Sequence, residues 1–155
     1  AITMIADSYD KEGRFKDAEE YYIKALQINP DGPVVNNNFA YFLSKFDDKL
    51  NDAEEMSLKA LNAEPNNASF IDTYGWILYR KGNFEEAKKF LEKALELMDY
   101  DNYELYEHLA LLYFKMGKGK EAIENMKKAL DLDPNNEKIK EEYQEIENSL
   151  NLKNK

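Results

Sequence analysis

The chain has 155 residues, a formal net charge of −10 and no cysteine. An acidic chain is a poor partner for nucleic acid, because phosphate binding depends on clustered Lys and Arg side chains that release counterions. The absence of cysteine excludes disulfide bonds and thiolate chemistry, and it is compatible with both the cytoplasm and the periplasm. We therefore expect a soluble domain in one of these compartments, with no nucleic-acid partner.

A helical hairpin is the first predicted element, and the same pattern returns three times along the chain. In the clearest copy, apolar residues recur at helical spacing from Phe70 to Leu78, a break follows at Gly82, and a second apolar stripe begins at Phe84. Gly82 is suited to the left-handed end of a helix. In chain order, the four predicted hairpins occupy residues 1–32, 33–66, 67–101 and 102–134.

The four hairpins differ in their turns and connections. Gly13 and Gly117 take the place of Gly82 in the first and fourth hairpins, whereas residues 47–49 replace it in the second, with one inserted residue. A proline able to stop the second helix follows every hairpin except the third. We expect the connection between the third and fourth hairpins to be looser or differently bent.

A charged segment after residue 134 carries one further apolar stripe, made of Ile139, Tyr143, Ile146 and Leu150. One apolar face and an otherwise polar surface predict a capping helix over residues 135–150, followed by a disordered tail at 151–155. Ala1 falls inside the first predicted helix, so we expect a fragment of a larger protein. No apolar run is long enough to span a bilayer, so we expect no direct membrane insertion.

Small residues recur in three columns, one position per hairpin. In the first column the steps between successive alanines are 35, 34 and 35 residues, which is the period of a solenoid of stacked helical hairpins. Antiparallel helices approach closely only where side chains are small. The predicted fold is therefore an all-α superhelix. The columns are Ala18, Ala53, Ala87 and Ala122; Ala25, Ala60, Ala94 and Ala129; and Ala6, Ala40, Gly75 and Ala110.

This pattern resembles the tetratricopeptide repeat (TPR) family, in four copies over residues 1 to 134. The sequence of residues 37–41 and 72–76 is similar to that of bacterial TPR proteins. Departures from the family pattern are the inserted turn residue, the missing third proline, and Asn36 where a bulky residue usually begins the first helix. In the third hairpin the resemblance is carried by residues 71–78, then Gly82, Phe84, Ala87, Leu91 and Ala94.

The resemblance implies a non-catalytic module that binds a protein or peptide along the concave face lined by the first helix of each hairpin. An aromatic and apolar strip and one cation per hairpin stand out there, which favours a partner with apolar anchors and some acidic groups. The first hairpin contributes Thr3, Asp7, Asp10 and Lys11 to this face. The candidate groove residues in the other hairpins are Asn37, Tyr41, Lys45, Asp72, Trp76, Tyr79, Arg80, Glu107, Leu111, Phe114 and Lys115.

Structural roles compete with these binding roles. A basic residue near a helix C-terminus is favourable through the helix dipole alone, and Trp76 and Tyr41 can pack on a neighbouring hairpin. Residues 36–38 can simply help to start a helix after Pro33, although Asn37 could also bind a peptide backbone amide.

Nothing in the sequence indicates catalysis. The single histidine, His108, has Glu104 one helical turn away, but one imidazole with carboxylates is poor ligation for a transition metal. No glycine-rich phosphate loop is present. We expect no enzyme activity and no cofactor or metal. Two alternatives to peptide binding remain: a scaffold that self-associates weakly through its open N-terminal end, and a spacer domain of a larger protein, either with or without an enzymatic domain.

Overall fold

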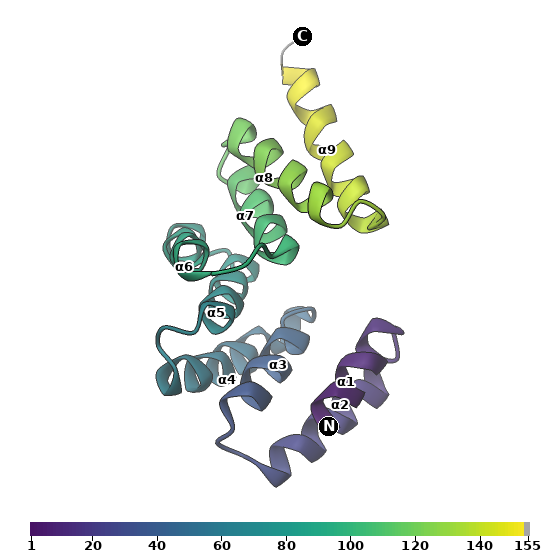
Figure 1. Ribbon diagram of the computed structural model, residues 1–155, viewed down its shortest axis with the longest axis vertical. Helices are drawn as coiled ribbons and strands as arrows, with labels where there is room; N and C mark the ends of the chain where they lie inside the picture. Colours follow the sequence, from purple (N-terminus) through teal and green to yellow (C-terminus); the bar gives the residue numbers. More distant parts are fainter. Residues whose placement is uncertain (154–155) are drawn as a thin grey trace.

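The computed structural model describes residues 1–153, which form nine α-helices and one short 3-10 turn. Eight of the helices pair as antiparallel hairpins and the ninth packs on the last hairpin (Figure 1). The hairpins are α1 (Ile2–Lys11) with α2 (Phe15–Ile28), α3 (Pro33–Leu43) with α4 (Leu50–Ala63), α5 (Ala68–Arg80) with α6 (Phe84–Leu97), and α7 (Tyr103–Lys115) with α8 (Gly119–Leu132).

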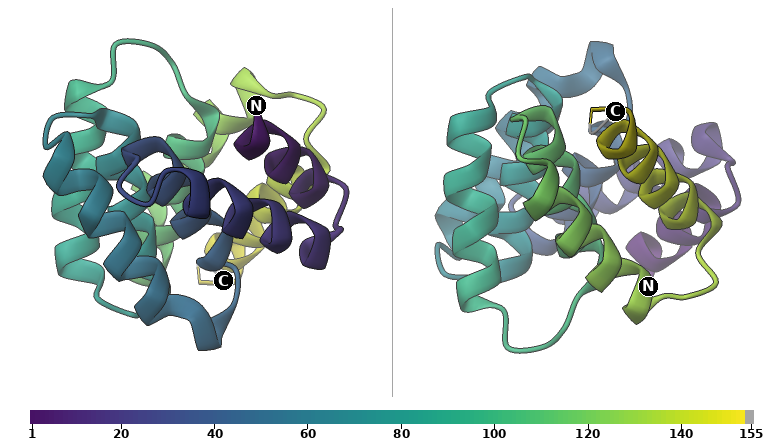
Figure 2. Two further views of the ribbon diagram at one scale, coloured as in Figure 1. Left: turned by 90° about the horizontal axis from the view of Figure 1, so that it is seen from below. Right: turned by 90° about the horizontal axis from the view of Figure 1, so that it is seen from above.

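The hairpins stack in chain order, so the two ends of the chain lie at opposite ends of the long axis (Figure 1). Seen along that axis, successive pairs are rotated relative to one another (Figure 2). The predicted all-α superhelix is therefore confirmed. The last helix, α9, spans Glu137–Lys153 and so continues beyond residue 150, where the sequence predicts the start of a disordered tail; residues 154 and 155 lie outside the described part of the chain.

The small-residue columns form the seams between helices. Their alanines are almost completely buried. At Gly75 the two helices of the third hairpin come closest, because a Cβ placed there would lie 2.9 Å from Cγ of Leu91. The seams are thus close-packed, as expected of a protein interior.

The turns follow the sequence pattern. Gly13, Gly82 and Gly117 have φ of 75°, 86° and 77°, a region that residues with a Cβ rarely adopt. The inserted residue of the second hairpin is accommodated by the 3-10 turn η1 (Asp47–Lys49). At the connection without proline, Met98 is extended, and the Asn102 side chain caps α7 by accepting hydrogen bonds from the amides of Glu104 and Leu105.

Candidate functional site

A polar cleft of about 280 Å³ lies on the face formed by the first helices of the hairpins. Asp7, Asp10 and Lys11 of α1 line it at one end, as the sequence predicts for the first hairpin. The other side chains relevant to binding come from the next three hairpins and are Asn37 and Tyr41 of α3, Asp72 of α5 and Glu104 of α7. The cleft therefore joins all four hairpins.

A buried histidine lies behind this cleft and connects three hairpins. His108 is only 1% exposed, and its Nδ1 lies 2.8 Å from Oδ1 of Asp72. Its Nε2 lies 3.2 Å from the Tyr41 hydroxyl, which donates its own proton to Oε2 of Glu104 at 3.1 Å. Because that hydroxyl has a single proton, Nε2 must donate to its oxygen. Both ring nitrogens are then donors, which describes an imidazolium.

The electrostatics of the site agree with this assignment. Burial alone would lower the pKa of His108, but the carboxylates of Asp72, Glu107 and Glu104 outweigh it and hold the pKa above its usual value of 6.5. Burial, followed by the charge of Glu104, raises the pKa of Tyr41 well above its usual range, so the phenol stays protonated. A neutral phenol and a buried imidazolium form a structural network rather than a nucleophile with its base.

The aromatic strip is mostly engaged within the protein. The Trp76 indole stacks on His108 with ring centroids 4.2 Å apart and on Tyr79 at 4.9 Å. The three rings thus form one stack across α5 and α7, and Trp76 remains partly exposed. The competing expectation, in which Trp76 packs on a neighbouring hairpin, describes its contact with His108, whereas Tyr41 of the second hairpin reaches His108 of the fourth.

Two of the predicted groove cations instead tie neighbouring hairpins together. Nζ of Lys45 binds the Asp10 carboxylate of the preceding hairpin. Arg80 donates to the carbonyl oxygen of Ser44 at 2.9 Å and to Oδ1 of Asp47 at 2.7 Å. The cause is geometric: the C-terminal end of each first helix lies beside the turn of the hairpin before it. Lys115 is exposed and keeps its predicted position.

In the fourth hairpin Glu107 is buried beside α9, so the expectation that it lines an open groove is wrong, whereas Leu111 and Phe114 are partly exposed. Glu107 is 5% exposed and accepts a hydrogen bond from Lys138 of α9 at 3.3 Å. Leu111 and Phe114 pack into the cluster that contains the apolar stripe of α9. That stripe packs mainly on α8, where Ala122, Met126 and Ala129 are its buried counterparts, and α7 contributes the edge of the same cluster.

Helix α9 brings a second carboxylate to Glu107. Burial, followed by the charge of Glu107, raises the pKa of Glu142 on α9 to about 7, although Lys138 and His108 act in the opposite direction. Oε1 of Glu142 is buried without a hydrogen-bond partner in the described residues. Ionisation of Glu142 is therefore unfavourable at the contact between α7 and α9.

Asn36 and Asn37 have different roles, which the sequence could not separate. The Asn36 amide donates to the carbonyl oxygens of Pro30 and Gly32, at 3.0 Å and 2.9 Å, and so fixes the start of α3. Asn37 is 8% exposed, and its Nδ2 donates to Oδ1 of Asn38 at 3.2 Å. Its own Oδ1 is buried and has no hydrogen-bond partner among residues 1–153. A buried acceptor without a donor beside a cleft is the clearest indication of a missing ligand.

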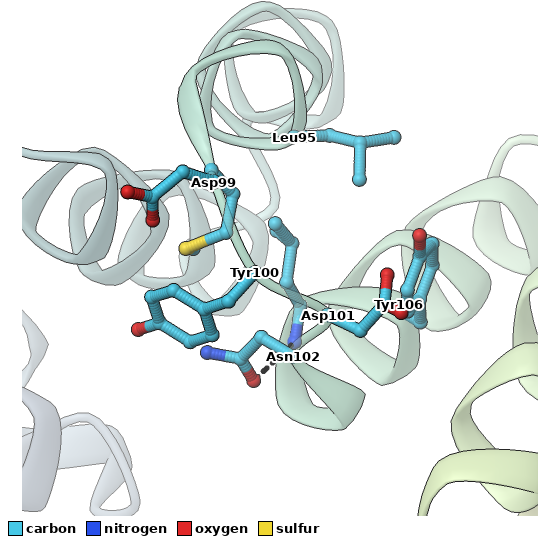
Figure 3. A pocket seen from close by; sticks show the side chains of 8 residues that line it. Leu95, Asp99, Tyr100, Asp101, Asn102 and Tyr106 are labelled. Carbon is cyan, nitrogen blue, oxygen red and sulfur yellow. Dashed lines mark hydrogen bonds between the residues drawn. The ribbon is translucent and has the colours of Figure 1, made fainter.

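A second cavity, of about 260 Å³, lies beside the connection between α6 and α7 (Figure 3). Leu95 and Leu105 contribute apolar surface to it, and Asp99 and Asp101 are exposed near its opening. Figure 3 shows the two carboxylates pointing to different sides of the connection. They do not converge on a common point, so we assign no site to this cavity.

The described part of the chain offers neither a metal site nor a membrane-spanning helix. Within residues 1–153, no group of three or more His, Cys, Asp and Glu side chains is placed to hold a metal ion. None of the helices described is both long and apolar enough to cross a bilayer.

Comparison with known proteins places the chain among repeat proteins. Family models described as tetratricopeptide repeat match residues 1–31, 68–101 and 103–136. The TPR repeat-containing protein MJ1428 of Methanocaldococcus jannaschii is 35% identical over 121 residues, which cover 76% of this chain. The chain spans only 20% of the length of that relative.

Solved structures share the architecture. The thermophilic TPR protein TTC0263 of Thermus thermophilus superposes with a TM-score of 0.75 at 22% identity, covering 94% of this chain and 79% of that one. YrrB, described as a TPR protein with an unusual peptide-binding site, gives a TM-score of 0.62 at 26% identity, with 79% and 62% of the two chains covered.

Proposed function

Because the chain belongs to the tetratricopeptide repeat family, whose members generally bind other proteins, we propose that it is a non-catalytic module that holds an extended segment of a partner protein. The segment lies in the polar cleft between α1, α3, α5 and α7. The peptide-binding site in the description of YrrB supports this assignment by similarity.

One observation carries the proposal, and it is the unpaired Oδ1 of Asn37. A buried carbonyl oxygen without a donor costs about 1–3 kcal/mol, and an amide N–H of a bound peptide would relieve that cost. In this structure the Asn37 amide directs its Nδ2 to Oδ1 of Asn38, which leaves its Oδ1 facing away from Asn38. The partner segment therefore meets an acceptor at this point.

The structure supports fewer acidic groups on the partner than the sequence suggested. Lys45 and Arg80 are bound to Asp10 and Asp47, so the basis for acidic groups on the partner is lost at these two positions. An apolar anchor retains one contact, the partly exposed indole of Trp76. We propose a mainly polar segment with an apolar residue near Trp76.

The test is a titration of the protein with a library of short peptides, followed through the fluorescence of Trp76, the single tryptophan. Binding peptides are then compared on Asn37→Ala and Trp76→Ala variants by chemical-shift changes in ¹H–¹⁵N spectra, because the second variant has no tryptophan. As a matched control we use Asn125→Ala, which removes a partly exposed asparagine of α8 that donates to the carbonyl oxygen of Glu121. We expect weaker binding to the first two variants alone. Equal affinity for all three would contradict the proposed site.

A second candidate function is self-association, and it is favoured by exposed apolar side chains at the N-terminal edge, the surface of α1 around Met4 and Ile5. Met4 and Ile5 of α1 are 72% and 42% exposed, whereas Phe39 and Leu109, at the place of Ile5 in other hairpins, are buried against the preceding hairpin. An exposed surface of this kind fits another helix pair, for instance from a second copy. Light scattering over a range of concentrations, with Ile5→Ser as the variant, separates the two functions. A molecular mass that rises in the wild type and not in Ile5→Ser supports the scaffold.

A further inference from the structure

The polar groups that line the cleft are mainly hydrogen-bond acceptors. Asp7, Asp72 and Glu104 contribute carboxylates, and Asn37 contributes its unpaired Oδ1. The hydroxyl of Tyr22 donates to Asp7 and that of Tyr41 donates to Glu104. Further donors on the lining are Lys11, Asn38, Ser69 and Asn102. The charge of the lining is nevertheless dominated by the carboxylates of Asp7, Asp10, Asp72 and Glu104, so a cationic ligand that carries donors complements it best.

The charges of the cleft are only partly balanced. Lys45 is paired with Asp10, and His108 is paired with Asp72. Among the residues that the structure describes, neither Asp7 nor Glu104 has a cation within salt-bridge distance. Among the described residues, Lys11 is the one cation on the lining, and its side chain is exposed. Glu104 also lies near the imidazolium of His108, whose pKa it helps to raise, so Asp7 is the carboxylate with the least compensation.

Three acceptor positions on three helices thus lie at the cleft: the partly exposed carboxylates of Asp7 on α1 and Glu104 on α7, and the buried, unpaired Oδ1 of Asn37 on α3. A guanidinium presents five N–H donors in a rigid plane, carries no acceptor and stays charged at every physiological pH. An ammonium has three donors at a single point, which suits separated acceptors less well.

From this juxtaposition we infer that the cleft selects a partner segment with an arginine side chain, placed between Asp7 and Glu104 with Oδ1 of Asn37 as a further acceptor. The inference rests on the proposed function and names the residue that the site would select. It differs from the expectation of an acidic partner, which depended on cations that the hairpins use to bind one another.

The first experiment uses four nine-residue peptides of glycine and serine, blocked at both ends, that differ only at the central residue. That residue is arginine, lysine, glutamate or citrulline, the last being a neutral copy of arginine with nearly the same shape. Binding to the full chain is followed by chemical-shift changes in ¹H–¹⁵N spectra, including the side-chain amide of Asn37. We expect the arginine peptide to bind at least about tenfold more tightly than the citrulline peptide, with lysine in between. Its affinity should fall as salt is added.

The second experiment tests whether the carboxylates of Asp7 and Glu104 are the ones that select arginine. The double variant Asp7→Asn with Glu104→Gln keeps the shapes of the side chains and removes two negative charges from the cleft. Its control is Asp99→Asn with Asp101→Asn, which removes the same charge from the exposed α6–α7 connection. We expect the preference for arginine over citrulline to disappear in the first variant and to persist in the second.

The outcomes separate this inference from the proposed function. Equal binding of arginine and citrulline, tighter binding of glutamate, or equal losses in both double variants overturns the arginine site. If library peptides still bind the cleft and depend on Asn37, the proposed function stands without it. If no peptide of either set binds the cleft, the proposed function fails and the arginine site fails with it.

Discussion

Gly75 occupies the column that holds alanine in the other three hairpins, and the structure shows why. An added Cβ would meet Cγ and Cδ2 of Leu91 at 2.9 Å, and Leu91 is completely buried. Neither atom can move away without disturbing the seam between α5 and α6. The sequence placed Gly75 in the column of close approach but could not show that Leu91 leaves no room for a Cβ there.

The substitution Gly75→Ala should therefore destabilise the protein, by about 1–3 kcal/mol through overpacking. In an ordinary helix interior the same change stabilises by about 0.5–1 kcal/mol, because glycine costs conformational entropy. The sign of the change in the free energy of unfolding, measured in urea, decides between the two. A gain in stability would show that the seam has spare room.

The pair of Asp72 and His108 is a buried charge pair between hairpins. Asp72→Asn leaves the imidazolium without its nearest counter-charge, so we expect a loss of about 3–5 kcal/mol in the free energy of unfolding near pH 6. Asp47→Asn also breaks an inter-hairpin contact, with Arg80, but the Asp47 side chain is 88% exposed. This control should cost at most about 1 kcal/mol. Similar losses in both variants would show that His108 does not depend on Asp72.

The same pair predicts a dependence on pH. Because folding raises the pKa of His108 above 6.5, the folded state binds the proton more tightly than the unfolded state. The stabilisation is complete below pH 6.5 and is lost as the pH rises through the pKa of the folded protein. The difference in unfolding free energy between wild type and His108→Gln should therefore shrink from pH 6 towards pH 9. A difference that stays constant or grows over this range would exclude an imidazolium in the folded protein.

At the scale of helices, α9 buries Glu107, a residue of the expected groove. Its apolar stripe is evident in the sequence at positions 139, 143, 146 and 150. The sequence alone assigns the inner face of α7, which carries Leu111 and Phe114, to a ligand groove. Both surfaces belong to one apolar cluster, whose buried centre comes largely from α8. Hydrophobic periodicity shows that a helix face is buried, but it does not say which element covers it.

The contact of α7 with α9 should weaken when Glu142 ionises beside Glu107. The pKa of Glu142 is raised from 4.5 to about 7, so its favourable contribution is complete below pH 4.5 and is lost as the pH rises to about 7. Glu142→Gln should accordingly stabilise α9 at pH 8 and have little effect near pH 4.5. Amide hydrogen exchange of α9 at the two pH values measures this. Faster exchange in the variant at pH 8 would contradict the assignment.

The ion-pair partners of the groove cations also could not be predicted from the sequence. Helical register placed Lys45 and Arg80 near their helix C-termini, but their partners Asp10 and Asp47 lie 35 and 33 residues earlier. Such contacts depend on the rotation between neighbouring hairpins, which the spacing of the repeat does not determine. The contact of Tyr41 with Glu104, across 63 residues, has the same origin.

For the whole molecule, the sequence was sufficient to predict the architecture, because one pattern written four times specifies both the hairpin and its stacking. It was not sufficient to predict the site. The cleft depends on how four hairpins are rotated about the long axis, and on which polar groups satisfy one another when they meet (Figure 2). Asn37 is the exception: its position suggested a peptide contact, and the structure leaves its acceptor unpaired.

The central claim is that the cleft between α1, α3, α5 and α7 holds a segment of a partner protein. The most direct measurement is a map of backbone amide shifts in ¹H–¹⁵N spectra of the full chain while a binding peptide is added. The account predicts that the largest shifts fall on the inner faces of these four helices, around Asn37, Asp72 and Glu104. Shifts confined to α2, α4, α6 and α8, or to the N-terminal edge at Met4 and Ile5, would contradict it.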